Sequence, residues 1–169
     1  MKNKILIISG GYSKEREISL QTGNQVAKEL KKNGYKIKIC EPDYKLFNLV
    51  KSYKPDIIFN ALHGQYGEDG YIQSILESIG IPYTHSGILA SAKAMDKELS
   101  KKIFIQNNIL TPRYIKHSLD DQHRELDIKI RKKFGYPVVI KPLNEGSSVN
   151  VYICNRSNLK TRLKKLKFY

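Results

Sequence analysis

Cysteine and long apolar runs are scarce in this chain, and their scarcity excludes several classes of protein. Only two of the 169 residues are cysteines, Cys40 and Cys154, and they form no Cys-x-x-Cys pair and have no histidine close to them in the sequence. This spacing argues against a zinc site or a disulfide framework and favours two reduced cysteines in the core. Apolar runs such as Ile5 to Ile8 are far shorter than the roughly 18 residues of a membrane span, and no signal-peptide segment follows Met1. We therefore expect a cytoplasmic protein with no membrane partner.

Acidic residues are scarce only in the second part of the chain. Residues 1 to 100 contain 14 Lys and Arg against 11 Asp and Glu, a net charge of +3, whereas residues 101 to 169 contain 16 against 5, a net charge of +11. Such an excess fits a domain that binds a polyphosphate, and it would also fit nucleic-acid binding. No zinc spacing, recognition-helix pattern or aromatic-interleaved basic stripe accompanies the charge, so we expect no nucleic-acid partner. No acidic cluster with metal-ligand spacing follows Glu145, so we expect no metal site in this chain.

Short apolar runs alternate with amphipathic stretches over the first part of the sequence. Strands are predicted at residues 4–9, 35–40, 57–61 and 82–83, and helices at 17–32, 45–52, 70–79 and 86–94. This alternation predicts an α/β fold with a parallel, Rossmann-like sheet and right-handed crossovers. A helix over 96–107 then leads to a second unit, with strands predicted at 113–115, 138–141 and 149–153 and helices at 121–134 and from 158. We therefore expect two domains, over residues 1–95 and 96–169.

A loop dense in glycine and charge follows one of the predicted strands. The run Asp56 to Leu62 suits a strand buried on both faces of a parallel sheet, and the loop His63 to Gly70 follows it directly. In open parallel sheets, ligands bind beyond the carboxyl ends of the strands, where this loop must lie. Its glycines permit close approach of a ligand, and the helix that starts near Gly70 offers free amides to an anion. The loop predicts a substrate site; the alternative is a glycine-rich turn with a solvated acidic pair.

A second loop, from Lys141 to Val149, has the composition of a phosphate site. It follows the apolar run Tyr136 to Ile140 and opens with a lysine whose ammonium can face phosphate oxygens. Gly146, Ser147 and Ser148 add backbone amides and hydroxyls that can surround a phosphate. The lysine precedes the glycine, and no Gly-Lys-Ser/Thr ends the segment, so the loop is not a Walker P-loop.

Five segments occur in the order found in the D-alanine–D-alanine ligases of the ATP-grasp superfamily. They are Gly10 to Ser19, His63 to Gly70, Ile81 to Thr84, Ala94 to Lys97, and Lys141 to Val149. Any one could arise by chance, but five in order form a specific pattern, so the chain resembles that family over almost its whole length. The resemblance implies a pre-ATP-grasp domain over residues 1–95 that binds D-alanine. It also implies that residues 96–169 form the first, incomplete part of an α+β ATP-grasp domain.

The resemblance also implies roles for individual residues. Glu15 would hold the ammonium of the first D-alanine, and Ser147 would orient Glu15 or the substrate across the domain junction. The other residues expected to bind substrate are His63, Gly64, Glu68 and Asp69, and those expected to bind ATP phosphates are Lys97, Lys141, Gly146, Ser147 and Ser148. Without the resemblance, Glu15 would be an ordinary first-turn glutamate, His63 a strand-end histidine bonded to backbone, and each lysine a solvated charge.

The activity implied by the resemblance is ATP-dependent joining of two D-alanines for peptidoglycan precursors of the cell wall. ATP phosphorylates the carboxylate of one D-alanine, and the amine of the second attacks the acyl phosphate. The implied cofactors are ATP and Mg²⁺, with Mn²⁺ as an alternative, and catalysis would be mostly positioning and charge stabilisation. D-alanine and ATP would be the small-molecule partners, and a homodimer is compatible with the family.

The length of the chain limits what the resemblance implies for activity. Three domains would need a chain of about 300 residues, whereas this one has 169. The magnesium ligands would lie in a further C-terminal part, so we expect no ligase activity from these residues alone and consider a separately encoded C-terminal half as a partner. Two alternatives are a non-catalytic remnant that binds D-alanine or nucleotide, and an ATP-grasp ligase that uses D-lactate or D-serine.

Two positions depart from the pattern of the family. His85 stands where glycine is usual before Ser86 and Gly87, and Asn150 stands where glycine usually follows Val149. Asparagine tolerates positive φ better than most residues, so we expect the second change to be mild. His85 adds bulk near the substrate-side turn and is expected to matter more.

Overall fold

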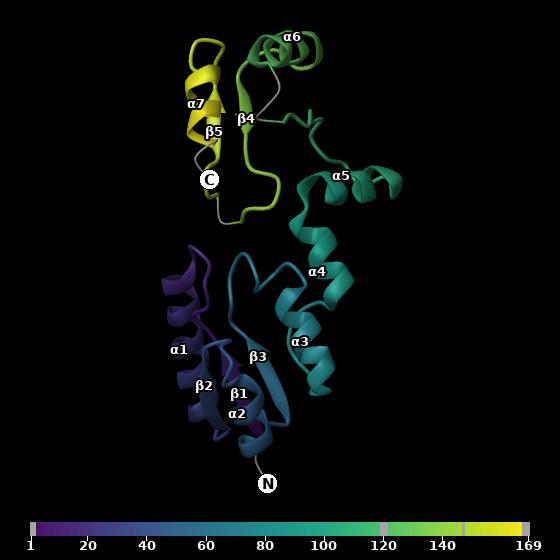
Figure 1. The fold of residues 1–169 in the computed structure, drawn as a ribbon. Coiled ribbons are helices and arrows are strands. Elements are labelled where there is room, and N and C mark those ends of the chain that lie inside the picture. The colour runs from purple at the N-terminus through teal and green to yellow at the C-terminus, as the bar shows by residue number, and fades with distance from the viewer. Residues whose placement is uncertain (1–2, 119–121, 147, 167–169) are drawn as a thin grey trace. The chain divides into compact units, whose positions relative to one another are not determined.

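The computed structural model describes residues 3–118, 122–146 and 148–166, which belong to two compact units (Figure 1). The first unit is Met1–Met95 and the second is Asp96–Tyr169. Within the described ranges, every helix is too short or too polar to cross a bilayer.

A parallel sheet forms the centre of the first unit. Strand β1, Lys4–Ile8, lies between β2, Lys36–Cys40, and β3, Ile57–Asn60, and pairs in parallel with both. Tyr83 adds one parallel bridge to Ile58, so residues 82–83 contribute a single pair and no full strand. The predicted α/β fold with a parallel sheet is confirmed.

Helices cover both faces of this sheet. Helix α1, Arg16–Lys32, packs against the face that carries Ile5 and Ile7. Helices α2, Leu46–Tyr53, and α3, Tyr71–Ile79, pack against the opposite face. Successive side chains of a strand point to opposite faces, so β1 supplies both layers of the core. Helix α4, Ile88–Met95, packs beside α3 at the end of the unit.

Helix α5, Lys97–Gln106, opens the second unit. Asp96 is its N-cap, and the Asp96 carboxylate accepts a hydrogen bond of 2.9 Å from the backbone N–H of Leu99. This contact satisfies one of the amides that a helix leaves unpaired at its first turn and defines where α5 starts.

A small antiparallel sheet forms the rest of the second unit. Strands β4, Val138–Ile140, and β5, Tyr152–Cys154, pair with each other, and helices α6, His123–Lys133, and α7, Leu159–Leu166, supply their core. Alternate strand residues face away from this core, and the side chains of Val139 and Ile153 are 54% and 71% exposed. The sheet is therefore covered on one face only.

One predicted strand of the second unit is wrong, and another begins later than predicted. Residues 113–115 form no strand, because lysine ammonium groups bind this segment where a ladder would: Lys101 donates to the carbonyl of Pro112 and Lys133 donates to the carbonyl of Tyr114. Residues 148–150 form a turn in which Ser148 and Asn150 have φ of 60° and 57°, so the last strand begins only at Tyr152.

Candidate functional site

Two serines join the loops at the carboxyl edge of the parallel sheet. The Ser19 hydroxyl, buried in α1, donates to the carbonyl of Ala61 at 2.8 Å and accepts from the N–H of Gly10 at 2.7 Å. The Ser13 hydroxyl donates to the carbonyl of His63 at 2.7 Å and accepts from the N–H of Glu15 at 3.1 Å. The ends of β1 and β3 are therefore fixed together, and the loops that follow these two strands form one site.

Glu15 lies against Gly64 at this junction. The Glu15 residue is only 6% exposed, and its Oε2 lies 2.5 Å from the place that a Cβ on Gly64 would occupy. Gly64 has a φ of +70°, which disfavours any L side chain. Among the residues that the structure describes, none donates a hydrogen bond to the Glu15 carboxylate. A buried carboxylate needs donors, so this group is suited to hold a cationic ligand.

His63 is oriented by two neighbours. Its Nε2 lies 3.0 Å from the Thr22 hydroxyl on α1, and its Nδ1 lies 3.8 Å from the Glu68 carboxylate. These contacts fix the ring on the α1 side of the loop, the same side as Glu15. Both ring nitrogens therefore have protein partners, and the orientation of the ring is defined.

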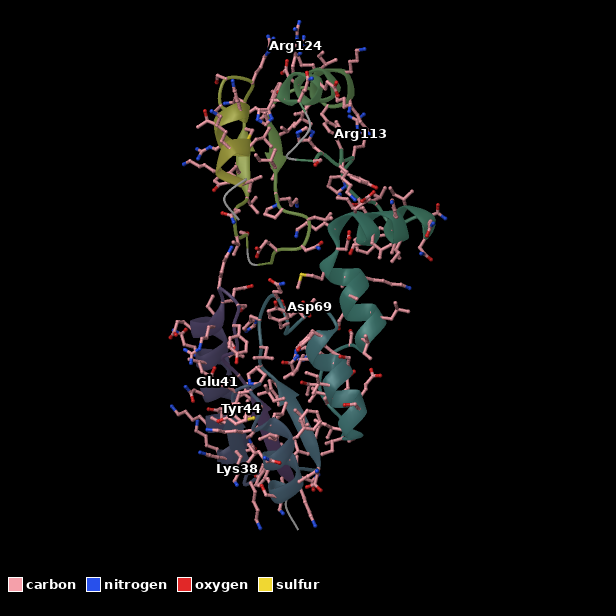
Figure 2. The ribbon with its side chains drawn as sticks, viewed as in Figure 1. Lys38, Glu41, Tyr44, Asp69, Arg113 and Arg124 are labelled. Carbon is pink, nitrogen blue, oxygen red and sulfur yellow. The ribbon has the colours of Figure 1, made fainter. Side chains whose placement is uncertain are left out.

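The two predicted acidic residues of the loop support its backbone. The Glu68 carboxylate accepts from the N–H of Gly64 at 2.9 Å, and the Asp69 carboxylate accepts from Tyr66 and Tyr71 at 2.9 and 3.1 Å. Asp69 therefore fixes the turn that leads into α3 (Figure 2). Its two oxygens are engaged by backbone, which agrees better with a structural role than with direct substrate binding.

Buried amides hold the other side of the loop. Asn60 and Gln73 both donate to the carbonyl of Gly67 at 2.9 Å, and both residues are almost fully buried. The loop conformation is therefore determined from the sheet and from α3 at once.

A cavity of about 710 Å³ lies on the α2 and α3 side of the same loops. Its lining includes Gly10, Leu62, His63, Tyr66 and Tyr71, together with the segment after β2 that contains Asp43 and Tyr44. Figure 2 shows Tyr44 and the neighbouring Glu41 in this segment. Glu41 binds the Arg16 guanidinium at 2.5 Å and so connects the segment to the start of α1.

The predicted phosphate site of the second unit centres on Lys97. Its ammonium donates to the carbonyls of Leu143 and Glu145, and its backbone N–H donates to the carbonyl of Leu143 at 3.2 Å. Burial, followed by the charge of Lys141, lowers the pKa of Lys97. Burial and the same neighbour also lower the pKa of Lys101, one turn further along α5. The charge of Lys141 therefore acts on both of these ammonium groups of α5, and a polyanion would relieve that repulsion.

The remaining residues of the phosphate loop are only partly described. Gly146 accepts a hydrogen bond from the N–H of Val149 at 2.9 Å, and Ser148 lies in the turn that follows. Ser147, predicted to act with Glu15 and to bind phosphate, lies outside the described residues. No group of three His, Cys, Asp or Glu side chains suited to a metal ion occurs within the described ranges.

The residues that hold the site together carry no role predicted from the sequence. Ser13, Ser19 and Thr22 lie in or next to the first matched segment, and Asn60 and Gln73 lie on either side of the loop. Polar residues inside apolar stretches were the available signal, since a buried polar side chain needs a partner.

Two family models match this chain. The model described as D-ala D-ala ligase N-terminus matches residues 41–86, and the model described as D-ala D-ala ligase C-terminus matches residues 103–168. Together these matches cover more than half of the chain.

Relatives and solved structures agree with this match. A D-alanine–D-alanine ligase from Pelagibacter ubique is 63% identical over 169 residues, which are 100% of this chain and 56% of that protein. One from Wolbachia pipientis wMel is 48% identical over 88% of this chain and 46% of its own length. The D-alanine–D-alanine ligase of Bacillus anthracis has a crystal structure that is 38% identical, with a TM-score of 0.81, over 97% of this chain and 53% of that one. A second crystal structure of that enzyme is complexed with ATP, and its TM-score is 0.76.

These likenesses point to one family of proteins with the fold described above. The chain belongs to the D-alanine–D-alanine ligase family, and it spans about half the length of the curated relatives it matches.

Proposed function

We propose that this chain supplies the D-alanine-binding domain and part of the ATP-binding domain of an ATP-dependent D-alanine–D-alanine ligase. The observation that carries the proposal is the buried Glu15 carboxylate, which lies beside Gly64 at the joined ends of β1 and β3, while the Ser13 hydroxyl accepts from the Glu15 backbone N–H. Its relatives act on D-alanine according to their names, and one neighbouring structure was solved with ATP. The product would serve as a peptidoglycan precursor, in the cytoplasm.

The first D-alanine would bind through its ammonium to Glu15. The backbone at Gly64 would then face the rest of the substrate, and His63 would bind it by exchanging one of its two protein partners. Glu68 and Asp69 would keep the loop in shape. A carboxylate with no other hydrogen-bond donor in the described part of the chain gains most from an ammonium, because charge-assisted hydrogen bonds are the strong ones.

ATP would bind at the second unit through the cluster of Lys97, Lys101 and Lys141. The two lowered lysine pKa values mark a site where positive charge is unfavourable without an anion. Gly146, Ser147 and Ser148 would add donors to the phosphates.

The decisive measurement is calorimetry with D-alanine on the wild-type chain and on Glu15→Gln. Loss of one charge-assisted contact is expected to weaken binding by about 10-fold to 100-fold. Glu17→Gln is the matched control, because Glu17 is exposed and paired with Arg16 at the surface. Equal D-alanine affinity in wild type and Glu15→Gln would refute the proposed role of Glu15.

A companion assay tests turnover. A polypeptide of these 169 residues, supplied with ATP, Mg²⁺ and D-alanine, is expected to bind substrate without making dipeptide. D-alanyl-D-alanine formed by the pure chain would contradict this expectation and would place all essential groups within these residues.

A further inference from the structure

One residue at the start of α5 makes three hydrogen bonds to the phosphate loop. The Lys97 ammonium donates to the carbonyls of Leu143 and Glu145, and the Lys97 backbone N–H also donates to Leu143. The three bonds go to two main-chain carbonyls, so these contacts fix the path of the loop and not merely the direction of one side chain.

The sequence separates the two strands by eleven residues, and the described backbone bonds within this loop are local. Between β4 and β5 the backbone bonds within the loop are those from Val149 to Gly146 and from Val151 to Ser148, both local turns. The apolar core of this unit contains Ile140 and Tyr152 at the two ends of the loop but no residue of 141–146. Within that stretch, the Lys97 ammonium of α5 bonds to the carbonyls of Leu143 and Glu145.

The chemistry of an ammonium matters here. It has three N–H donors and no acceptor, so two loop carbonyls leave one donor over. Lys97 is partly buried beside Lys141, and both features disfavour a cation unless its hydrogen bonds are made. The loop carbonyls supply that compensation when no nucleotide is bound.

We propose that Lys97 is a positioning residue, which fastens loop residues 141–146 to the first turn of α5 and keeps its third N–H for a phosphate oxygen. The fastening stands on the contacts of this chain alone, and the phosphate contact rests on the proposed function. In this arrangement the loop is already shaped before ATP arrives, and less ordering is required on binding.

Amide hydrogen exchange in the absence of nucleotide tests the fastening. Two amides report on it: that of residue 97, bonded to Leu143, and that of Val149, bonded to Gly146. In Lys97→Met their protection factors are expected to fall about tenfold or more, since two bonds from a charged donor are lost. Lys97→Arg is expected to retain most of the protection, because a guanidinium can also donate to two carbonyls.

Two matched controls separate fastening from charge. Lys101→Met removes a neighbouring ammonium of α5 whose bonds go to Thr111 and Pro112, and Lys141→Met removes the lysine that opens the loop. Both are expected to leave the amides of residues 97 and 149 protected. Unchanged protection in Lys97→Met, or an equal loss in either control, would overturn the proposal. If Lys97→Met also loses amide protection in β4 and β5, the whole unit is destabilised, and the milder Lys97→Gln is measured in its place. A loss of protection at residues 97 and 149 in Lys97→Gln supports the proposal, and unchanged protection overturns it.

Nucleotide binding is measured in a second experiment. Calorimetry with a non-hydrolysable ATP analogue is expected to show weaker binding for both Lys97→Met and Lys141→Met, but faster loop exchange for Lys97→Met only. Absence of any ATP-analogue binding would count against the proposed function and leave the exchange result intact.

Discussion

The two units of this chain are stabilised in different ways. In the first, a three-stranded parallel sheet has helices on both faces, and its central strand is almost completely buried. In the second, a two-stranded sheet is covered on one face only, and lysine side chains bind backbone carbonyls at three places. Residues 1–95 carry 13 Lys and Arg against 9 Asp and Glu, whereas residues 96–169 carry 17 against 7.

This difference shows which forces shape the candidate site of each unit. Buried neutral groups such as Ser19, Asn60 and Gln73 fix the loops of the first unit from the core. The carboxylates of Glu68 and Asp69 add bonds from backbone N–H groups. The phosphate loop of the second unit depends on ammonium groups that repel one another. Packing of an apolar core can hold a substrate pocket in shape before the substrate binds. A site for a polyanion contains like charges, which repel one another until the anion binds.

The largest effect is expected from the core of the first unit. Leu6→Ala removes a side chain with no exposed surface and is expected to lower the free energy of unfolding by about 2–5 kcal/mol. Leu89→Ala, at a 65% exposed position of α4, is the control and should cost about 0.5 kcal/mol or less. Urea denaturation followed by resolved amide signals measures each unit separately. If Leu6→Ala lowers the free energy of unfolding of both units equally, the two units unfold together and are not stabilised independently.

Gly64 tests whether the substrate side is rigid. Gly64→Ala forces a Cβ to 2.5 Å from the Glu15 carboxylate, whereas Gly80→Ala, at a similar φ of +75°, meets nothing within 4 Å. Both should lose about 1–2 kcal/mol to the left-handed backbone. Only Gly64→Ala should also weaken D-alanine binding, as measured by calorimetry. Equal D-alanine affinity in the two variants would mean that Glu15 moves freely.

Asp127 offers a pH-dependent test in the second unit. Its carboxylate accepts from the Tyr136 hydroxyl at 2.9 Å and pairs with Arg131 and Arg156, and these contacts, led by Tyr136, lower the pKa of Asp127. A depressed carboxyl pKa contributes stability above the unfolded value of about 3.9, and this stability is lost as pH falls through the folded value. Asp127→Asn should therefore lower the melting temperature at pH 7, with a smaller difference from wild type near pH 3.

The control for this titration lies on the same helix. Glu125→Gln also removes one carboxylate from α6, in the first turn of the helix. It is expected to change the melting temperature less than Asp127→Asn at pH 7. If the difference in melting temperature between wild type and Asp127→Asn is the same at pH 7 and at pH 3, the charge on Asp127 is not what stabilises the unit.

Sequence patterns predicted the first unit better than the second for a physical reason. Buried parallel strands are continuous apolar runs, so β1 and β3 are visible in the sequence, whereas residues 113–115 look like a strand but bind lysine ammonium groups. The loop after β3 and the position of Glu15 followed from glycine, charge and the family resemblance. The contacts made by Ser13 and Thr22 did not, because they join segments about 50 and 41 residues apart along the chain.

The smallest effect concerns His85, a residue in the first unit where the family usually has glycine. His85 has a φ of 80°, and its ring contacts Phe59 edge-on with centroids 6.2 Å apart. Replacing it with glycine relieves about 1–2 kcal/mol of backbone strain, but costs entropy of the unfolded chain and the ring contact, about 0.5–1 kcal/mol each. The net change for His85→Gly is therefore expected to lie within about 1 kcal/mol of zero.

A pair of variants makes this small effect measurable. His85→Ala loses the ring and keeps the strain, so His85→Gly should be more stable than His85→Ala by about 1 kcal/mol. At position 92, inside α4, alanine should instead be more stable than glycine, because Ala92→Gly costs about 1 kcal/mol in a helix. If alanine proves more stable than glycine at both positions, the left-handed backbone at His85 carries no strain. In that case the backbone of His85 would be unstrained at its φ of 80°, and a histidine in place of glycine would cost no stability at this turn.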